Sequence, residues 1–198
     1  MKQTSENTRL KYELCEAARQ CLAGSSVEKL TVGQITTRAG VSRQTFYRTF
    51  QDKYDLINWY FDKLMSKSFD RMGEGKTIDE GLRLKFSYLK EEGDFFRAAF
   101  ASDAQNNLKE HDFEMIFHFY SDWIVKKSGS SPTDEIALLL ELYCRASIYM
   151  TVKWVLGGMQ QSPEWLARLL VDALPEKLRD KFACLDLLEE TDSAGHWQ

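Results

Sequence analysis

The chain has 198 residues, of which 43% are hydrophobic and 28% are charged, and its formal net charge is −4. This composition is ordinary for a globular protein, so it excludes disordered and fibrous classes. A stretch of about 18 uncharged apolar residues, as a membrane span requires, does not occur, and the N-terminus has no apolar signal region. We therefore expect a cytoplasmic protein that does not associate with a membrane.

Charge is distributed unevenly along the chain. Residues 1–53 hold nine lysines and arginines against five acids, a balance of +4, so the remaining 145 residues carry −8. A basic N-terminal quarter on an acidic body indicates a module that faces phosphate groups.

Apolar residues recur at spacings of three and four, and strand-like alternation does not appear, so the sequence predicts an all-α protein. Cap residues and glycine or proline signals divide the chain into helices. In chain order, helices are expected at about 8–23, 31–39, 42–48, 52–72, 78–92, 94–102, 106–128, 132–157, 162–174 and 175–189. We expect two domains, a DNA-binding domain at 1–52 and a regulatory domain at 53–198, joined through the helix at about 53–72.

The second and third helices have the pattern of a helix-turn-helix. Gly40 supplies a tight turn and Ser42 can cap the third helix, while Phe46 and Phe50 share its buried side. In such a motif the second of the two helices, which here is the third helix of the chain, enters the major groove of DNA. Arginine can pair with guanine, glutamine with adenine, and a threonine methyl can pack on thymine.

Polar side chains in and around the third helix are left without an internal role. On a helical wheel Gln44 and Arg48 point directly away from the buried side. Thr31, Tyr47 and Lys53 suit phosphate contacts. The candidate DNA-contacting residues are Thr31, Arg43, Gln44, Thr45, Tyr47, Arg48, Thr49 and Lys53.

The segment "LTVGQITTRAGVSRQTFYRTFQDKYDLI" resembles the DNA-binding segment of the TetR family (TetR/AcrR type) of bacterial transcriptional regulators. The similarity covers about residues 8–60, and the rest of the chain resembles the family in helical layout and size. The resemblance implies a homodimer that binds a near-palindromic double-stranded operator, commonly as a repressor. Family contacts at the start of the second helix fall on Val32 and Gly33, which offer no side-chain donor, so more of the readout is expected from the third helix.

The C-terminal part is rich in aromatic residues, which more often form a core than a binding site. The family resemblance nevertheless implies a pocket there for a small apolar or aromatic ligand. Its expected lining is Phe96, Phe117, Tyr120, Trp123 and Tyr149.

The helices at about 132–157 and 162–174 are expected to form the dimer interface, by similarity to the family. An apolar seam on the first of them is broad enough to pack on both the core and a partner. It comprises Ala137, Leu140, Tyr143, Cys144, Ser147, Met150 and Thr151. The alternative is a helix that is simply buried within one subunit.

Residues with metal-binding or catalytic potential do not form a complete site. His111, Glu114 and His118 share one helical face, but a fourth ligand is not evident. The four cysteines lie far apart in apolar helical patterns, which predicts buried free thiols. We expect no metal, no cofactor and no enzymatic activity. The alternative function is a co-regulator of the same fold that docks another protein and responds little or not at all to a ligand.

Overall fold

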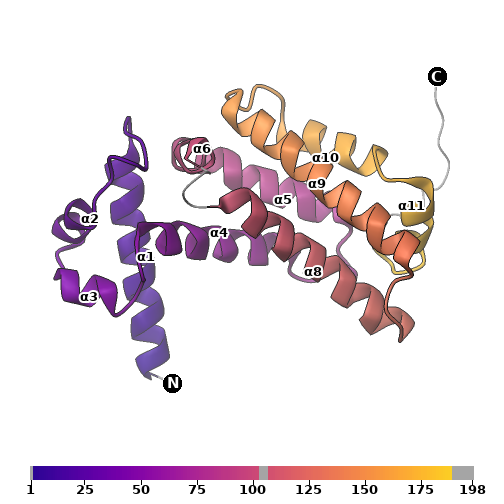
Figure 1. Cartoon of the computed structure of the whole chain (residues 1–198), viewed down its shortest axis with the longest axis horizontal. Coiled ribbons are helices and arrows are strands. Elements are labelled where there is room, and N and C mark those ends of the chain that lie inside the picture. Colours follow the sequence, from indigo (N-terminus) through magenta and orange to yellow (C-terminus); the bar gives the residue numbers. More distant parts are fainter. Residues whose placement is uncertain (1, 103–106, 189–198) are drawn as a thin grey trace. The chain divides into compact units, whose positions relative to one another are not determined.

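The computed structural model describes residues 2–102 and 107–188, and the regular elements in these ranges are all helices, as predicted (Figure 1). They are α1 (Lys2–Leu22), α2 (Val32–Ala39), α3 (Arg43–Tyr47), α4 (Lys53–Phe69), α5 (Ile78–Glu91), α6 (Gly93–Ala101), α8 (Leu108–Ser128), α9 (Asp134–Leu156), α10 (Pro163–Asp172) and α11 (Glu176–Ala183). The predicted first helix begins too late, because α1 starts at Lys2. The predicted start of the helix at 106–128 and the predicted end of the helix at 175–189 lie outside the described residues.

The chain divides into two compact units. Unit 1 comprises Met1–Met65 and Glu92–Leu108, and unit 2 comprises Ser66–Glu91 and Lys109–Gln198. This division does not coincide with the predicted boundary after residue 52. Most of α4 and all of α6, which were expected in the regulatory domain, group with the helix-turn-helix.

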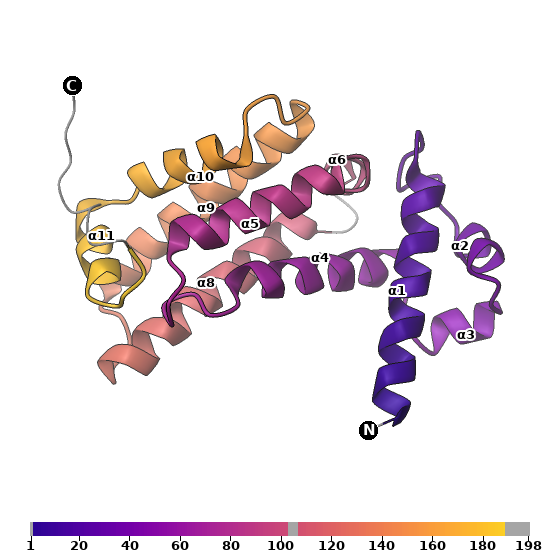
Figure 2. The same cartoon turned by 180° about the vertical axis from the view of Figure 1, so that it is seen from behind.

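Unit 1 is built around α1, with α2 and α3 packed beside it (Figure 2). Local capping explains where these short helices begin. Thr31 and Gln34 form a reciprocal capping box at the start of α2, and the Ser42 hydroxyl accepts a hydrogen bond from the Thr45 amide at the start of α3. Gly40 takes the left-handed conformation between the two helices, with φ of 69°.

The core of unit 1 consists of apolar side chains from α1, α2, α3, α4 and α6. Those buried almost completely include Leu14, Ala18, Ile35, Phe46, Phe61 and Phe96. The Phe46 ring lies 5.9 Å from that of Phe50, so the inner side of α3 is anchored by two aromatic rings. The outer side of this five-residue helix is therefore presented in a defined orientation.

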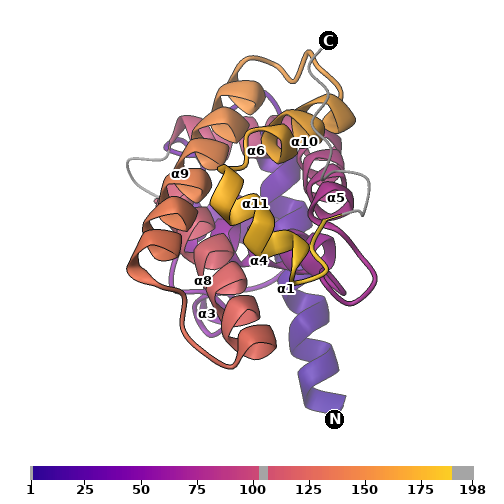
Figure 3. The same cartoon turned by 90° about the vertical axis from the view of Figure 1, so that its right-hand side faces the viewer.

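Unit 2 is a bundle in which α5, α8, α9 and α10 surround a common interior and α11 crosses one end (Figure 3). The interior is mainly apolar and aromatic, and it also contains a buried ion pair. The Lys85 ammonium donates to both carboxylate oxygens of Asp112 at 2.8 Å, with side chains 3% and 0% exposed. Such a pair keeps two buried charges compatible with the core, but removing one partner is costly.

The four cysteines are free thiols, and only two of them are buried. Cys15 and Cys144 lie in the core, Cys21 is half-buried, and Cys184 is exposed. The prediction that all are buried fails at Cys184, because it is the C-cap residue of α11 and lies beside the exposed Ala183, while the helix buries Leu178 and Phe182. In the described ranges, none of the helices combines the length and apolar character that crossing a bilayer requires.

Candidate nucleic-acid interface

Four exposed side chains on α3 and its C-cap residue make no hydrogen bond or ion pair with another described residue. Arg43, Gln44, Tyr47 and Arg48 are exposed, and Tyr47 retains 58% of its accessible surface. Among the described residues, their side-chain polar atoms make no hydrogen bond or ion pair. We call these four residues the recognition face. Guanidinium, amide and phenol groups held by a rigid aromatic anchor are suited to base edges and phosphates.

Three other predicted DNA contacts use their hydroxyls locally. Thr31 donates to the Gln34 side-chain oxygen at 3.0 Å and accepts from the Gln34 amide at 3.2 Å. The hydroxyls of Thr45 and Ser42 lie 2.9 Å apart, and that of Thr49 donates to the Thr45 carbonyl at 2.9 Å. Their DNA contacts remain predictions, in which methyl groups or remaining lone pairs would take part.

Lys53 has a structural role that the sequence did not reveal. Its ammonium donates to the carbonyl oxygens of Val27, Glu28 and Leu30 at 2.6, 3.2 and 2.9 Å. These bonds use all three donors of the ammonium and tie the first residue of α4 to the loop before α2. The predicted phosphate contact of Lys53 remains a prediction, because such a contact would have to share these donors.

Arg43 folds back from α3 over the first turn of α2. A Cβ atom added at Gly33 would lie 2.8 Å from the Arg43 Nη2 atom and 3.6 Å from its Cζ and Nε atoms. The guanidinium therefore rests on the surface that the missing side chain of Gly33 leaves open. Gly33 has no side chain that could donate a hydrogen bond to DNA, but the guanidinium of Arg43 lies at this position and can do so.

This guanidinium lies at the edge of an open groove of about 1,120 Å³ in unit 1. Residues from the C-terminal part of α1, from α2 and from the start of α3 line the groove, among them Thr31, Gly33, Arg38 and Arg43. The lining is more polar than a small-molecule pocket usually is. A polar, arginine-bearing groove next to the recognition face fits a nucleic-acid backbone better than an apolar ligand.

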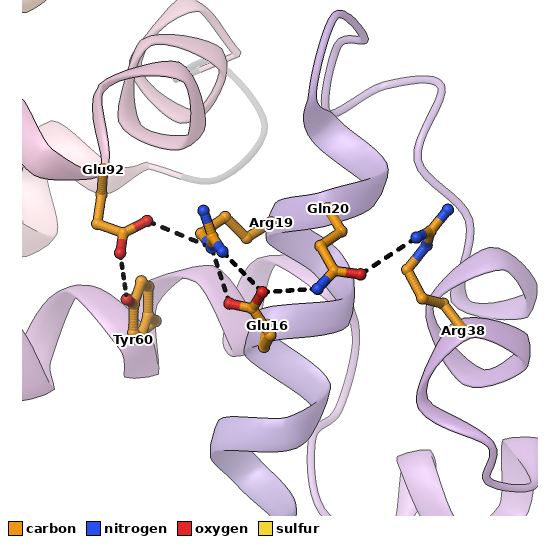
Figure 4. A network of polar contacts seen from close by, with 6 residues as sticks. All are labelled: Glu16, Arg19, Gln20, Arg38, Tyr60 and Glu92. Carbon is orange, nitrogen blue, oxygen red and sulfur yellow. Dashed lines mark hydrogen bonds and ion pairs between the residues drawn. The ribbon is translucent and has the colours of Figure 1, made fainter.

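A network of polar contacts connects α2 with α1 and with the rest of unit 1 (Figure 4). On one side, Arg38 donates to the Gln20 side-chain oxygen at 3.1 Å, and Gln20 donates to Glu16 at 2.6 Å. Arg19 donates to both oxygens of Glu16 at 2.8 and 2.7 Å. The hydrogen bonds from Arg19 and Gln20 lower the pKa of Glu16, so this carboxylate stays ionised.

The same network continues to α4 and α6. The Nε atom of Arg19 lies 3.6 Å from the Glu92 carboxylate, which accepts a hydrogen bond from the Tyr60 hydroxyl at 3.1 Å (Figure 4). Burial and the nearby Glu92 raise the pKa of Tyr60, so its phenol remains a donor. Spacing in the sequence could have found the pairs within α1, but not the contacts with Glu92 or Arg38.

The five residues predicted to line a ligand pocket are divided between the two units, and their role in ligand binding remains a prediction. Phe96 belongs to unit 1, where it is buried against Tyr60 and Phe61. The other four belong to unit 2. Of these, Phe117 packs on Phe113, and Tyr149 is 67% exposed on the outside of α9.

Tyr120 and Trp123 each line a different hollow of unit 2. Tyr120 borders an interior cavity of about 10 Å³, which has room for a single water. Trp123 borders a cleft of about 320 Å³, within the size range of small-molecule sites. This cleft is lined by aromatic, methionine and polar residues: Ser66, Phe69, Asp70, Arg71, Met72, Glu74, Met115, Phe119 and Trp123.

The outer face of α9 carries exposed apolar side chains, unlike the recognition face. Leu138, Leu142 and Tyr149 are 68%, 63% and 67% exposed, and we call these three residues the α9 outer face. The seam predicted from the sequence lies mostly on the opposite side. Its members Leu140, Tyr143, Cys144, Ser147 and Thr151 are buried within the chain.

A capped helix-turn-helix with a free polar recognition face, followed by a helical bundle, defines a class of DNA-binding transcriptional regulators. Two family models match this chain. One, described as bacterial regulatory proteins of the tetR family, matches residues 14–59, and the other, a transcriptional regulator C-terminal region of TetR type, matches residues 76–175. The chain belongs to the TetR family of transcriptional regulators, which bind DNA and act as dimers.

A curated relative is the HTH-type dhaKLM operon transcriptional activator DhaS of Lactococcus lactis. It is 24% identical over 90 residues, which are 46% of this chain and 48% of DhaS, so the match spans about half of that relative. The solved structure of a dihydroxyacetone kinase operon activator DhaS superposes with a TM-score of 0.66 and 19% identity, over 86% of this chain and 97% of that one.

Two further solved structures share the fold at a TM-score of 0.52. The repressor AlkX of Dietzia sp. is 18% identical over 86% of this chain and 95% of its own. RolR, solved in complex with resorcinol, is 12% identical over 92% of this chain and 95% of its own. At these identities the structural likeness supports the fold alone.

Proposed function

We propose that this regulator acts in the cytoplasm as a homodimer on a near-palindromic operator, which it reads chiefly through the recognition face. The observation that carries this proposal is that the polar atoms of Arg43, Gln44, Tyr47 and Arg48 make no hydrogen bond or ion pair with other described residues, although Phe46 beneath them is completely buried. Donors that are exposed on an anchored helix and not used within the protein are available to base edges and phosphate groups.

The dimer is proposed to form through α9 and α10. Leu138, Leu142 and Tyr149 on α9, with the half-exposed Trp165 on α10, supply apolar surface that a second copy would cover. Two recognition helices are needed because one helix of five residues contacts too few bases for a genomic site. Half-sites about 34 Å apart would place them in consecutive major grooves.

Repression is the proposed outcome, because an operator-bound dimer blocks transcription by occupancy alone and needs no further surface. We also propose that a small apolar or aromatic ligand modulates DNA binding from unit 2. The cleft beside Trp123, with its aromatic and methionine lining, supports this part of the proposal. A ligand that favours one arrangement of the dimer would change operator affinity by shifting the population of states.

Selection of duplexes from a random library by the full-length protein tests the proposal. We expect a two-fold symmetric consensus, bound with a dissociation constant that rises steeply with salt. Arg48→Ala should weaken binding to that consensus about tenfold, the loss of one good base or phosphate contact. Lys67→Ala, which removes a cation from an exposed position of α4 outside the proposed DNA and dimer contacts, serves as a matched surface control.

Two results would contradict the proposal. A protein that enriches no sequence would not be an operator-binding regulator, and a co-regulator that docks another protein would become the better description. A consensus bound equally well by Arg48→Ala, with no effect of Arg43→Ala either, would move the contacts away from the recognition face.

A further inference from the structure

Gly33 and Arg43 form a pair across the turn of the helix-turn-helix. The Arg43 guanidinium lies so close to Gly33 that an added Cβ would come within 2.8 Å of Nη2. Among the described residues, Arg43 makes no hydrogen bond or ion pair that would otherwise hold it there. The absence of a side chain at residue 33 is therefore what leaves this position open to the guanidinium.

The backbone does not require glycine at this place. Gly33 is the second residue of α2 and does not adopt a positive φ, in contrast to Gly40 at the end of the same helix. Glycine within a helix is less favourable than alanine because it loses more conformational entropy on folding. A glycine that neither the turn nor the helix needs has to be explained by what lies against it.

We propose that Gly33 is a specificity-determining residue of this regulator, because it sets the position of the Arg43 guanidinium and thereby the base that Arg43 reads. Gly33 acts through Arg43 and is a positioning residue rather than a contact. This inference rests on the DNA-binding role of the recognition face proposed above.

The physical reason is that base readout by arginine depends on geometry. A guanidinium selects guanine by donating two parallel hydrogen bonds to O6 and N7, and a displacement of an ångström or more breaks at least one of them. A methyl group at residue 33 would push the end of the flexible arginine aside, while the backbone of α2 stays in place. Gly33→Ala should thus alter recognition and leave the fold intact.

The test combines selection from a random duplex library with a double-mutant cycle on the full-length protein. The variants are Gly33→Ala, Arg43→Ala and the double variant, with Lys67→Ala as a control at an exposed residue of α4 that lies outside the groove and the recognition face. Arg43→Ala should relax one base position in each half-site and lower affinity about ten- to a hundredfold. Gly33→Ala should relax or change that same position, lower affinity about tenfold, and leave the rest of the consensus unchanged.

In the double variant, Gly33→Ala should add no further loss, because the group that it displaces has been removed. The thermal unfolding midpoint of Gly33→Ala should equal that of the wild type or exceed it by up to about 4 °C, so weaker binding cannot come from unfolding.

The inference is overturned if Gly33→Ala keeps the wild-type consensus and affinity, or if it weakens binding as much in the Arg43→Ala background as alone. Failure of the proposed function looks different. In that case the wild-type protein itself enriches no sequence, and the inference falls together with it.

Discussion

The recognition face on α3 and the outer face of α9 are both exposed, but they differ in chemistry. α3 is five residues long and presents donors, with two guanidinium groups, an amide and a phenol. α9 is 23 residues long and presents leucines and a tyrosine at exposures above 60%. Exposed donors are satisfied by water until a polar partner replaces it, whereas exposed apolar surface is unfavourable until it is covered.

This difference indicates what each face binds. Loss of water from the α9 outer face favours association with another apolar surface, such as the same face of a second copy. The recognition face gains from a partner that supplies acceptors in a fixed array, which DNA does. Substitutions on each face and in the protein interior test this contrast.

If the two exposed faces serve binding, substitutions on them should leave the protein folded. Substitutions in the interior of unit 2 should instead lower its stability. Lys85→Met leaves the Asp112 carboxylate buried without its cation and should lower the free energy of unfolding by about 3–5 kcal/mol. Urea denaturation measures this loss in the free energy of unfolding. The double variant with Asp112→Leu should recover much of the loss, and Arg145→Ala, in an exposed pair with Glu110, should cost less than about 1 kcal/mol. A small effect of Lys85→Met would show that water reaches the pair.

Leu142→Glu should abolish association if the α9 outer face is the dimer interface. A carboxylate on each subunit would be buried without a partner, which should raise the dimer dissociation constant at least about a hundredfold. Sedimentation velocity should find folded monomers. The matched control is Val125→Glu, which places the same charge at an exposed apolar position of α8. A dimer that tolerates Leu142→Glu would assign the interface to other residues.

Within the helix-turn-helix, a structural cation should behave differently from a recognition cation. Lys53→Met removes three charge-assisted hydrogen bonds to carbonyl groups and should destabilise the protein by about 2 kcal/mol. Arg48→Ala should change stability by less than about 0.5 kcal/mol while weakening operator binding. Thermal unfolding with and without operator duplex separates the two effects. If Arg48→Ala lowered stability while Lys53→Met weakened only operator binding, Arg48 would be the structural cation and Lys53 the recognition cation.

Cysteine reactivity should distinguish the interior of unit 2 from its surface. Burial raises the pKa of Cys144 from 9.0 to about 12, so a thiolate-specific reagent at neutral pH should modify the exposed Cys184 and leave Cys144 unmodified.

The raised pKa of Cys144 also links its thiol to stability. The folded state keeps the proton that the unfolded state releases, so this contribution is complete below about pH 9 and is lost as the pH rises toward 12. Thermal unfolding across this range, with Cys144→Ala as the comparison, should show a steeper decline in the wild type. Equal slopes would mean that Cys144 is hydrated.

Local features of the chain predicted the helix-turn-helix closely. Thr31, Ser42 and Gly40 act within one turn of their own positions, so capping and a left-handed glycine are visible in the sequence. The early start of α1 was missed because its first turn is polar and lacks the apolar spacing that marked the other helices.

Residues whose roles depend on distant partners were not predictable in this way. Tyr149 was expected in a pocket because it belongs to the aromatic-rich C-terminal part, and composition does not say which side of α9 faces the core. Phe96 was expected in the regulatory domain, but α6 groups with unit 1. The Lys53 contacts and the Arg38 to Glu92 network join residues far apart in the chain.

The sequence by itself determined the all-α class, the family, the helix-turn-helix and the outward direction of Gln44 and Arg48, since these follow from composition, spacing and caps within a few residues. Tertiary structure alone decided which cations are free, which side of α9 is exposed, and what occupies the space above Gly33. These properties depend on side chains that meet across turns and between helices. Gly33 has no side chain to contact DNA, and its importance follows only from the tertiary structure, in which Arg43 lies against it.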